Sequence, residues 1–395
     1  MLREQSLATG LSWKVRTSEP VAYDVIETVD LLEPGNPLLM TTSGGRGSAR
    51  RFVAVDEALL DSLADPLEKY FAQYGATCQL LSVPAGEANK DLRAFQLVSD
   101  ALDGFGIQRR NEPVLAVGGG VVTDLVGFAA SCYRRGVPYV RVPTTVMGYV
   151  DAAIGIKTGI NHNGAKNRIG SFAAPVATLL DRRFLRTLPL RHVRNGVGEM
   201  LKLAVIKDAD LFAQLERDGP GAVEDRFQGS GADLLHGAIR GMLEELEPNL
   251  HEANLERAMD FGHTFSPALE MSHLGDLLHG EAVAIDVALS MMLSRVRGMV
   301  DEATCDRVLQ MSGRLGLPVG HPGVRPSLLW EGLQERSAHR NGRQRVPLVE
   351  GLGRCAFVND ITLGQLRAAC RALSDWAERD QARADRYGAG HQGNR

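Results

Sequence analysis

The sequence predicts an α/β domain followed by an all-α domain. Short apolar runs of strand length alternate with amphipathic helical runs as far as about residue 185, which is typical of a mostly parallel sheet covered by helices. Beyond that point long amphipathic segments dominate. A chain of 395 residues is long enough for two or three domains and a sizeable core, and 44% hydrophobic residues is typical of a globular protein. We therefore expect an α/β domain over 1–185, a helical domain over 186–378 and a polar, disordered tail over 379–395.

In the first half, apolar runs bounded by turn residues have the length and composition of strands. The predicted strands are 37–42, 51–55, 78–83, 113–117, 139–143 and 177–181. Amphipathic patterns between them predict helices, and these include 56–74, 90–105 and 124–132. Because parallel strands need a crossover connection, which is usually a helix, this alternation favours a parallel sheet.

The second half has apolar residues at helical spacing over longer segments. The predicted helices are 196–217, 233–250, 257–271, 280–298, 301–316 and 361–378. One hairpin is expected between 345–348 and 355–358. We therefore predict that this half is helical, with a single small β element.

Composition and charge exclude several functional classes. The net charge of −4 gives no electrostatic reason to expect nucleic acid or an anionic membrane as partner. No apolar stretch approaches membrane-spanning length, and residues 1–20 lack the apolar region of a signal peptide. The five cysteines are few, odd in number and scattered, which fits a reducing compartment. We expect a cytoplasmic protein.

A glycine triplet, Gly118–Gly119–Gly120, follows the predicted strand 113–117 and precedes a predicted helix. A helix N-terminus in this context can bind a nucleotide pyrophosphate. The run departs from the G-x-G-x-x-G pattern because Thr123 stands where the third glycine would be. Taken alone, it predicts a tight turn as readily as a cofactor loop.

Three residues of the second half have the chemistry of a metal site. His263 lies in Phe-Gly-His-Thr-Phe, His279 in Leu-His-Gly-Glu-Ala, and Glu199 in Gly-Val-Gly-Glu-Met. Two imidazoles and one carboxylate can hold a divalent metal and leave positions open for substrate oxygens. The alternative for each residue is a buried polar group with an ordinary hydrogen-bond partner.

The segment 157–168 combines Lys157, Lys166 and Arg168 with three asparagines and shows no strong periodicity. Cations mixed with amides suit a phosphorylated polyol, and Asp151 lies just upstream in an apolar setting. The alternative is a solvated loop.

Eight short motifs occur in one order along the chain, from about residue 35 to 375. They are 84–87 with Lys90, 118–124, 143–145, 151–157, 166–167, 198–202, 262–264 and 278–281. Together they resemble the dehydroquinate synthase-like sugar phosphate cyclases. The resemblance implies an N-terminal NAD-binding α/β domain, a C-terminal helical domain with a catalytic metal, and an active site in the cleft between them.

The resemblance also implies a role for individual residues. The expected ligands of Zn²⁺ or Co²⁺ are Glu199, His263 and His279. The expected NAD contacts are Asp56, Glu87, Lys90, Gly119, Gly120, Asp124, Thr144, Thr145, Phe184 and Thr187. The expected substrate contacts are Asp151, Lys157, Lys166, Asn167 and Lys202. Arg135 matches an arginine that a neighbouring subunit lends to the phosphate site, so a homodimer is expected.

Some positions depart from the dehydroquinate synthases. Asp260 replaces their asparagine, Pro267 replaces a second histidine, and Met242 falls where they place a lysine facing the substrate carboxylate. Their late lysine pair is replaced near His339–Arg340, and an arginine is displaced in the region of Arg257. A carboxylate without cations would cost several kcal/mol as an order of magnitude. We therefore expect a substrate with a neutral polyol end, which Asp260 would contact.

The pattern resembles the cyclases that use sedoheptulose 7-phosphate in C7-cyclitol antibiotic biosynthesis. Such a lyase would oxidise one carbinol with NAD+, eliminate phosphate, return the hydride and close the ring by an aldol addition. This resemblance implies 2-epi-5-epi-valiolone as product, with 2-epi-valiolone or desmethyl-4-deoxygadusol as alternatives. A metal-dependent polyol dehydrogenase and a non-catalytic sensor that kept the fold are competing hypotheses.

Overall fold

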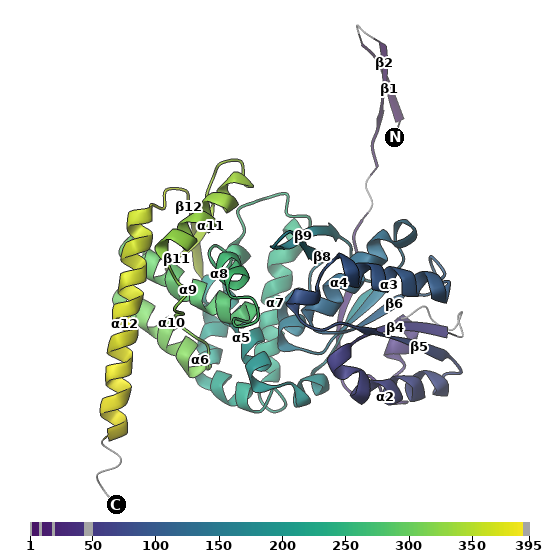
Figure 1. Ribbon diagram of the computed structural model, residues 1–395, viewed down its shortest axis with the longest axis horizontal. Helices are drawn as coiled ribbons and strands as arrows, with labels where there is room; N and C mark the ends of the chain where they lie inside the picture. The colour runs from purple at the N-terminus through teal and green to yellow at the C-terminus, as the bar shows by residue number, and fades with distance from the viewer. Residues whose placement is uncertain (1, 8–9, 18–19, 43–49, 390–395) are drawn as a thin grey trace, which may run out of the picture.

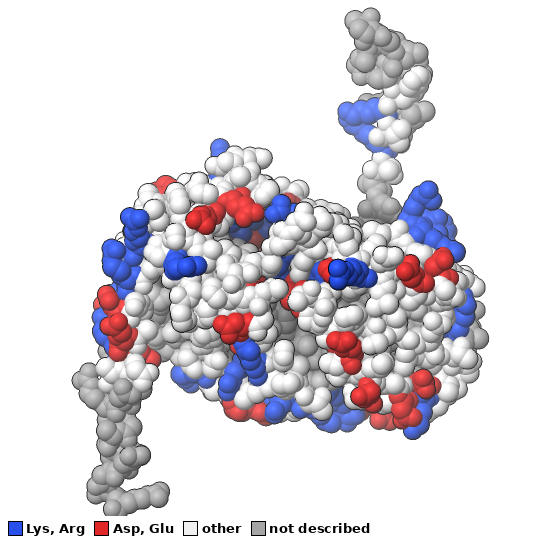
Figure 2. Space-filling view, in the orientation of Figure 1, with Lys and Arg blue, Asp and Glu red and all other residues white. Residues whose placement is uncertain are grey.

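The computed structural model describes residues 2–7, 10–17, 20–42 and 50–389. An α/β half and a helical half lie side by side (Figure 1). On the face shown in Figure 2, charged side chains of both signs are interspersed with large uncharged areas. Among the described residues, no helix combines the length and apolarity that crossing a membrane requires.

The α/β half is built on a six-stranded sheet in which every neighbouring pair is parallel. In spatial order the strands are β3 (Asp24–Thr28), β10 (Ala177–Asp181), β7 (Tyr139–Pro143), β6 (Val114–Gly118), β4 (Arg50–Asp56) and β5 (Thr77–Val83). The central strands β6, β7 and β10 are buried throughout, as expected for a parallel sheet covered on both faces. Five predicted strands are confirmed.

The sixth predicted strand, 37–42, is wrong. This segment forms a short helix, α1 (Leu38–Thr42), in which Leu39 and Met40 are buried. Pro37 directly before it has a fixed φ that suits the start of a helix, and a short apolar run fits either structure. The edge strand β3 was not predicted.

Helices cover both faces of the sheet. They are α2 (Leu60–Gln73), α3 (Leu92–Phe105) and α4 (Gly120–Cys132). Phe52 and Ala54 of β4 pack with α3 and α4, whereas Val53 and Val55 pack with α2. This alternation follows from the two-residue period of a strand and builds two separate cores.

The segment 157–168 is not a plain loop. It belongs to a hairpin of β8 (Lys157–His162) and β9 (Ala165–Phe172). Asn163 and Gly164 at its tip have φ of 48° and 71°, the conformation in which an Asn-Gly turn fits the twist of a hairpin. A second hairpin, β1 (Leu2–Leu7) and β2 (Gly10–Val15), projects away from the body in Figure 1.

The helical half is arranged around one buried helix, α9 (His279–Val296), which is apolar on nearly all sides and therefore central. Its neighbours include α5, α8, α10, α12 and β11. The other elements are α5 (Leu190–Ile206), α6 (Ala209–Glu224), α7 (Ala232–Leu246), α8 (Ser266–Ser272), α10 (Glu302–Arg314), α11 (Pro326–Ala338), β11 (Val346–Gly351), β12 (Arg354–Val358) and α12 (Leu363–Ala389). The predicted hairpin is confirmed.

Three predictions for this half need correction. The segment 196–217 spans two helices, because Asp208 caps the start of α6 by accepting from the Leu211 N–H. The segment 257–271 is not one helix: it forms a 3₁₀ turn at Ala258–Asp260 and irregular chain up to α8, because Gly262 adopts a φ of 72° that a helix does not allow. Helix α12 continues through 379–389, so the predicted disordered tail is wrong there, while 390–395 lie outside the described residues.

The predicted domain boundary at residue 185 falls in a 3₁₀ turn, η6 (Arg182–Thr187). This turn separates the last strand of the sheet from the first helix of the helical half. The division into two domains stays a prediction.

Candidate active site

A cavity of about 1770 Å³ lies between the two halves. It is larger than the ~300–1000 Å³ of an ordinary small-molecule site, so it has room for two ligands side by side. The predicted site residues that line it are Asp56, Glu87, Lys90, Gly119, Gly120, Asp124, Thr144, Thr145, Asp151, Lys157, Lys166, Asn167, Phe184, Thr187, Lys202, Asp260, His263 and His279. Glu199 lies directly behind His263 and His279, and Arg135 does not line the cavity.

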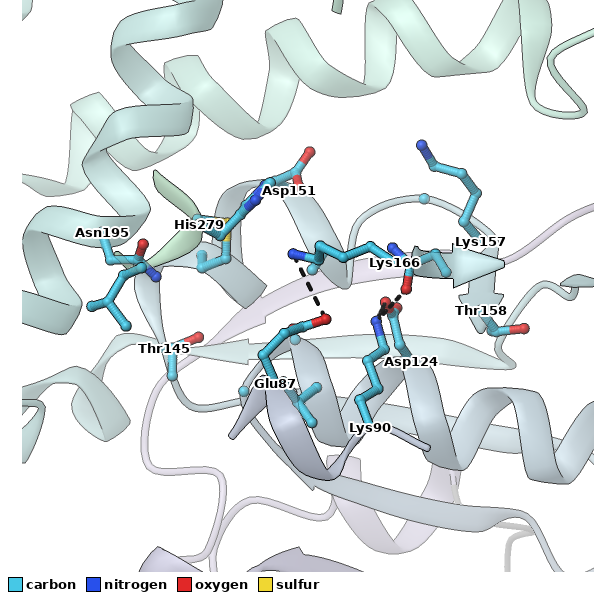
Figure 3. Close-up of a pocket in the computed structure, with 18 of the residues that line it drawn as sticks. Glu87, Lys90, Asp124, Thr145, Asp151, Lys157, Thr158, Lys166, Asn195 and His279 are labelled. Atoms are coloured by element: carbon cyan, nitrogen blue, oxygen red, sulfur yellow. Dashed lines mark hydrogen bonds and ion pairs between the residues drawn. The ribbon is translucent and has the colours of Figure 1, made fainter. Parts of the chain in front are cut away.

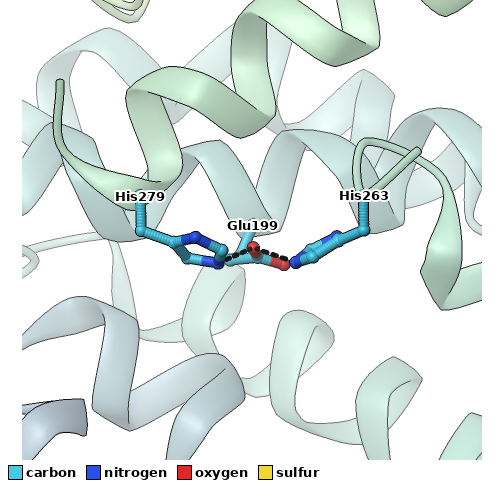
Figure 4. Close-up of side chains that lie close together, drawn as sticks. All are labelled: Glu199, His263 and His279. Atoms are coloured by element: carbon cyan, nitrogen blue, oxygen red, sulfur yellow. Dashed lines mark ion pairs between the residues drawn. The ribbon is translucent and has the colours of Figure 1, made fainter. Parts of the chain in front are cut away.

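The three predicted metal ligands come together (Figure 4). Their ligand atoms lie within 4.8 Å of one another. Glu199 Oε1 is 3.5 Å from His263 Nε2 and 3.3 Å from His279 Nε2. Neither buried Glu199 oxygen has a well-aligned hydrogen bond, and Lys202 forms an ion pair with Oε2. A buried carboxylate left in this state, facing two imidazole nitrogens, fits a divalent metal.

Close contact between two helices brings these ligands into register. A Cβ added to Gly198 on α5 would lie 2.4 Å from the Gly280 carbonyl oxygen on α9. The Asn195 side chain accepts a 2.6 Å hydrogen bond from the Gly280 N–H at the start of α9. Glu199 and His279 are the residues adjacent to this contact, so the small residues set their separation.

His263 lies on the irregular segment before α8, which is held from two sides. The buried Asp286 on α9 accepts hydrogen bonds from the Phe265 and Ser266 N–H groups. Arg336 on α11 donates to the His263 carbonyl oxygen at 2.7 Å. The His263 Nδ1 lies 3.4 Å from the Phe261 carbonyl oxygen, which leaves Nε2 to face Glu199.

The three ligands differ in protonation. Burial would raise the pKa of Glu199, but Lys202 and the two imidazoles lower it well below its usual value, so the carboxylate is ionised. Burial and the Lys202 charge lower the pKa of His263 to about 3, so this imidazole is neutral. Burial and Lys166 oppose a charge on His279, but the contacts of its ring with the Glu199 and Glu270 carboxylates raise its pKa to about 9.

The predicted NAD contacts gather at the carboxyl ends of the strands. Asp56 ends β4, Gly119 follows β6, and Thr144 follows β7. Space around the triplet is limited, because an added Cβ on Gly120 would lie 3.0 Å from the Ala152 Cβ. In open parallel sheets this edge is where nucleotides bind, and the triplet stands at the start of α4.

A set of lysines and carboxylates faces the cavity beside the hairpin (Figure 3). Lys90 Nζ is 2.6 Å from Asp124 and 2.7 Å from the Asn167 side-chain oxygen. Lys166 Nζ is 3.7 Å from Glu87. Lys157, whose side chain is 63% exposed, is the most accessible of these cations and forms an ion pair with Glu252 at 3.1 Å.

The loop that follows η5 (Gly148–Ala152) is held by a buried cation. Arg141 on β7 is fully buried and donates to the carbonyl oxygens of Gly155 and Lys157. Asp151 lies on η5, and burial raises the pKa of its carboxyl group. Arg141 therefore holds the loop that connects Asp151 to Lys157.

Asp260 is surrounded by arginines that the sequence analysis did not bring together. Arg257, Arg336 and Arg340 lie 2.6, 3.1 and 2.7 Å from its carboxylate. Although burial opposes ionisation, these three charges hold the pKa of Asp260 far below its usual value. The predicted polyol contact is thus a carboxylate already engaged with three cations.

Sequence reasoning missed Glu270 and Arg336. Glu270 on α8 contacts His279 and Lys166, and Arg336 contacts both Asp260 and His263. The one signal for Glu270 was a carboxylate at an apolar position seven residues after His263. Arg336 lies on α11, a helix that was not predicted, so nothing in the sequence placed this arginine near the site.

Arg135 lies in the η4 turn (Tyr133–Arg135) after α4. Arg134 and Arg135 both have positive φ, at 49° and 63°, which is rare for residues other than glycine. Its predicted contact with a partner's phosphate site stays a prediction.

Comparisons with known proteins agree with this geometry. Residues 80–195 match the family model "3-dehydroquinate synthase N-terminal", and residues 196–336 match "3-dehydroquinate synthase C-terminal". The 2-epi-5-epi-valiolone synthase of Streptomyces albus is 46% identical over 372 residues, covering 90% of this chain and 89% of the relative. The demethyl-4-deoxygadusol synthase of Trichormus variabilis is 37% identical, covering 92% and 90%.

A solved structure is similar along most of its length. It is ValA, a 2-epi-5-epi-valiolone synthase from Streptomyces hygroscopicus subsp. jinggangensis with NAD+ and Zn²⁺ bound. It matches with a TM-score of 0.89 at 46% identity, covering 92% of this chain and 99% of that one. With both family models matched in order and the predicted two-part fold confirmed, this chain belongs to the 3-dehydroquinate synthase family.

Proposed function

We propose that this protein converts sedoheptulose 7-phosphate to 2-epi-5-epi-valiolone with release of phosphate, using NAD+ and Zn²⁺ or Co²⁺. Membership of the family makes it an enzyme of the sugar phosphate cyclase type. The observation that carries the proposal is one cavity in which the Glu199–His263–His279 cluster faces the strand ends of the sheet. Relatives 46% identical carry this name, and one of them holds NAD+ and Zn²⁺.

Glu199, His263 and His279 would hold the metal, which when bound acidifies substrate hydroxyl groups. The strand-end residues, from Asp56 to Thr187, would hold NAD+, which accepts a hydride and later returns it. Because the hydride returns, the reaction has no net redox change. The protein would then act as a carbon–oxygen lyase that opens C7-cyclitol biosynthesis.

The remaining polar residues would bind the sugar phosphate. Lys157 and Asn167 would hold the phosphate group and stabilise its charge as it leaves. Lys202, beside Glu199, would orient a hydroxyl group near the metal. Asp151, whose pKa is raised by burial, can hold a proton in the same region. Arg135 of a partner subunit would complete the phosphate site in a homodimer.

Substrate choice would depend on Asp260. Its carboxylate engages Arg257, Arg336 and Arg340, so these cations are not available to a carboxylate on the substrate. A carboxylated substrate would also place its charge near the carboxylate of Asp260, which is unfavourable. Met242 and Pro267 line the same cavity and add no cation. These features favour an uncharged polyol end.

Two alternatives remain distinct. A 2-epi-valiolone or desmethyl-4-deoxygadusol synthase would use the same substrate. The demethyl-4-deoxygadusol synthase is 37% identical to this chain, less than the 46% of the 2-epi-5-epi-valiolone synthase. A polyol dehydrogenase would accumulate NADH. Its substrate carries no phosphate group, so it would not need the cations of the hairpin. Incubation with sedoheptulose 7-phosphate and trace NAD+, followed by NMR of the product, separates these outcomes. A product spectrum other than that of 2-epi-5-epi-valiolone would overturn the proposed product.

A further inference from the structure

A buried carboxylate outside the predicted ligand set connects the two halves of the cavity. Glu270 on α8 is 3% exposed. Its Oε2 is 2.9 Å from His279 Nδ1, and its Oε1 is 2.7 Å from Lys166 Nζ. His279 belongs to the helical half, whereas Lys166 comes from β9 of the hairpin in the α/β half. One side chain therefore contacts a residue on each side.

We propose that Glu270 is a positioning residue that fixes the metal ligand His279 and the cavity-facing Lys166 at the same time. The inference rests on the proposed metal role of His279, but not on the identity of the substrate. Both carboxylate oxygens of Glu270 are engaged, because one accepts from His279 and the other accepts from Lys166. The same residue would thus join the metal site to the phosphate-facing hairpin.

For His279, the contact decides which ring nitrogen faces the metal position. A carboxylate that accepts from Nδ1 keeps a proton there, so Nε2, which faces Glu199, is the ring nitrogen left to bind a metal. Figure 3 shows His279 at the cavity wall near Asp151 and Lys166. Without Glu270, the imidazole would lose the partner that sets both its tautomer and its orientation.

For Lys166, the contact supplies the nearer of two anions. Glu87 is the other, at 3.7 Å, the contact drawn in Figure 3. Lys166 is only 15% exposed, so its ammonium group depends on these carboxylates rather than on water. Removing one partner of a buried ion pair leaves a poorly compensated charge, and the side chain would move toward solvent.

The chain offers a matched control. Arg168, two residues further along β9, pairs with Glu335 on α11 at 3.3 Å, so it also links the hairpin to the helical half. Both side chains are exposed, at 48% and 65%, and Glu335 contacts no metal ligand among the described residues. Glu335→Gln removes a connection of the same kind without touching His279.

The test measures Zn²⁺ affinity of the full-length protein by competition with a chelator. Glu270→Gln and Glu270→Ala are expected to weaken Zn²⁺ binding by about 10- to 100-fold, and Glu335→Gln by less than about twofold. His279→Ala is the reference for the metal site. If His279→Ala leaves Zn²⁺ binding unchanged, the proposed metal site fails. If it abolishes binding while both Glu270 variants bind normally, the role of Glu270 fails alone.

The second readout is the rate at which an amine-reactive reagent labels Lys166, followed by mass spectrometry. Labelling of Lys166 should rise several-fold in Glu270→Gln and stay unchanged in Glu335→Gln. Lys69, which is 71% exposed, reports the intrinsic reactivity of the reagent in each sample. Unchanged labelling of Lys166 in folded Glu270→Gln would show that Glu270 does not anchor it.

Discussion

At the residue scale, His263 and His279 are the same side chain in opposite electrostatic settings. Burial and the Lys202 charge disfavour a proton on His263, whereas on His279 the carboxylates of Glu199 and Glu270 outweigh burial and favour one. The sequence could identify both histidines and Glu199, because each lies in a specific sequence motif of the family. It could not identify Glu270 as a partner of His279, because that contact depends on how α8 packs beside α9.

Metal affinity should depend on pH through His279. Without metal its pKa is about 9, raised from 6.5, so below about pH 9 the metal must displace a proton. His263 is already neutral and Glu199 already ionised, so neither adds to this dependence near neutrality. Zn²⁺ affinity should rise about tenfold per pH unit between about pH 6.5 and pH 8.5. Affinity that stays flat in chelator competition over this range would contradict the assignment.

Asp260→Asn tests the arginine cluster. The substitution leaves Arg257, Arg336 and Arg340 without their shared carboxylate, so stability in urea should fall by roughly 3 kcal/mol. The same cations should now bind a substrate carboxylate. The ratio of activity on the carboxylated substrate of dehydroquinate synthase to activity on sedoheptulose 7-phosphate should therefore rise. Glu224→Gln, which breaks an exposed pair with Arg194, should cost less than about 1 kcal/mol. An unchanged ratio would show that Asp260 does not govern substrate choice.

At the element scale, the site depends on where helices touch and where the chain turns. Periodicity predicted most strands and helices, because the sheet and α9 are buried enough to impose a pattern. It failed at 257–271, where apolar residues at helical spacing flank Gly262 in a non-helical conformation. It also failed at the β8–β9 hairpin, whose polar residues face a cavity rather than alternating between core and solvent.

Gly198→Ala should disrupt the site through the contact between α5 and α9. The new Cβ would lie 2.4 Å from a backbone oxygen, so the helices must separate. We expect a loss of roughly 1–3 kcal/mol of stability and markedly weaker Zn²⁺ binding. Gly221→Ala on α6 is the control, because a Cβ there meets nothing within 4 Å and alanine favours the helix. Thermal unfolding and Zn²⁺ titration that show no difference between the two variants would refute the packing argument.

At the scale of the whole molecule, neither half contains a complete site. The strand ends and the hairpin come from the α/β half, and the metal ligands come from the helical half. The sequence predicted this division because the resemblance covers most of the chain. The way the halves meet could not be predicted, because it depends on contacts such as Lys166 with Glu270 between residues far apart in sequence.

A shared site in a homodimer can be tested by mixing subunits. Arg135 does not line the cavity of its own chain, whereas Lys157 does. Lys157→Ala should therefore inactivate the site of its own subunit, and Arg135→Ala should inactivate the site of the partner subunit. In a two-fold dimer, heterodimers of the two variants would contain one intact site. Sedimentation and mass spectrometry would verify the heterodimer before activity is assayed. Recovery of a fraction of wild-type activity is expected, and verified heterodimers without activity would exclude the shared site.

The most direct measurement of the central claim compares phosphate release with NADH formation. The protein is loaded with Zn²⁺ and given sedoheptulose 7-phosphate with NAD+ far below the substrate concentration. We predict many phosphate molecules released per NAD+, with no steady increase in absorbance from NADH, because the hydride returns to the substrate. Phosphate release that stops after one equivalent of NAD+, or that is matched by accumulated NADH, would contradict the proposed cyclase.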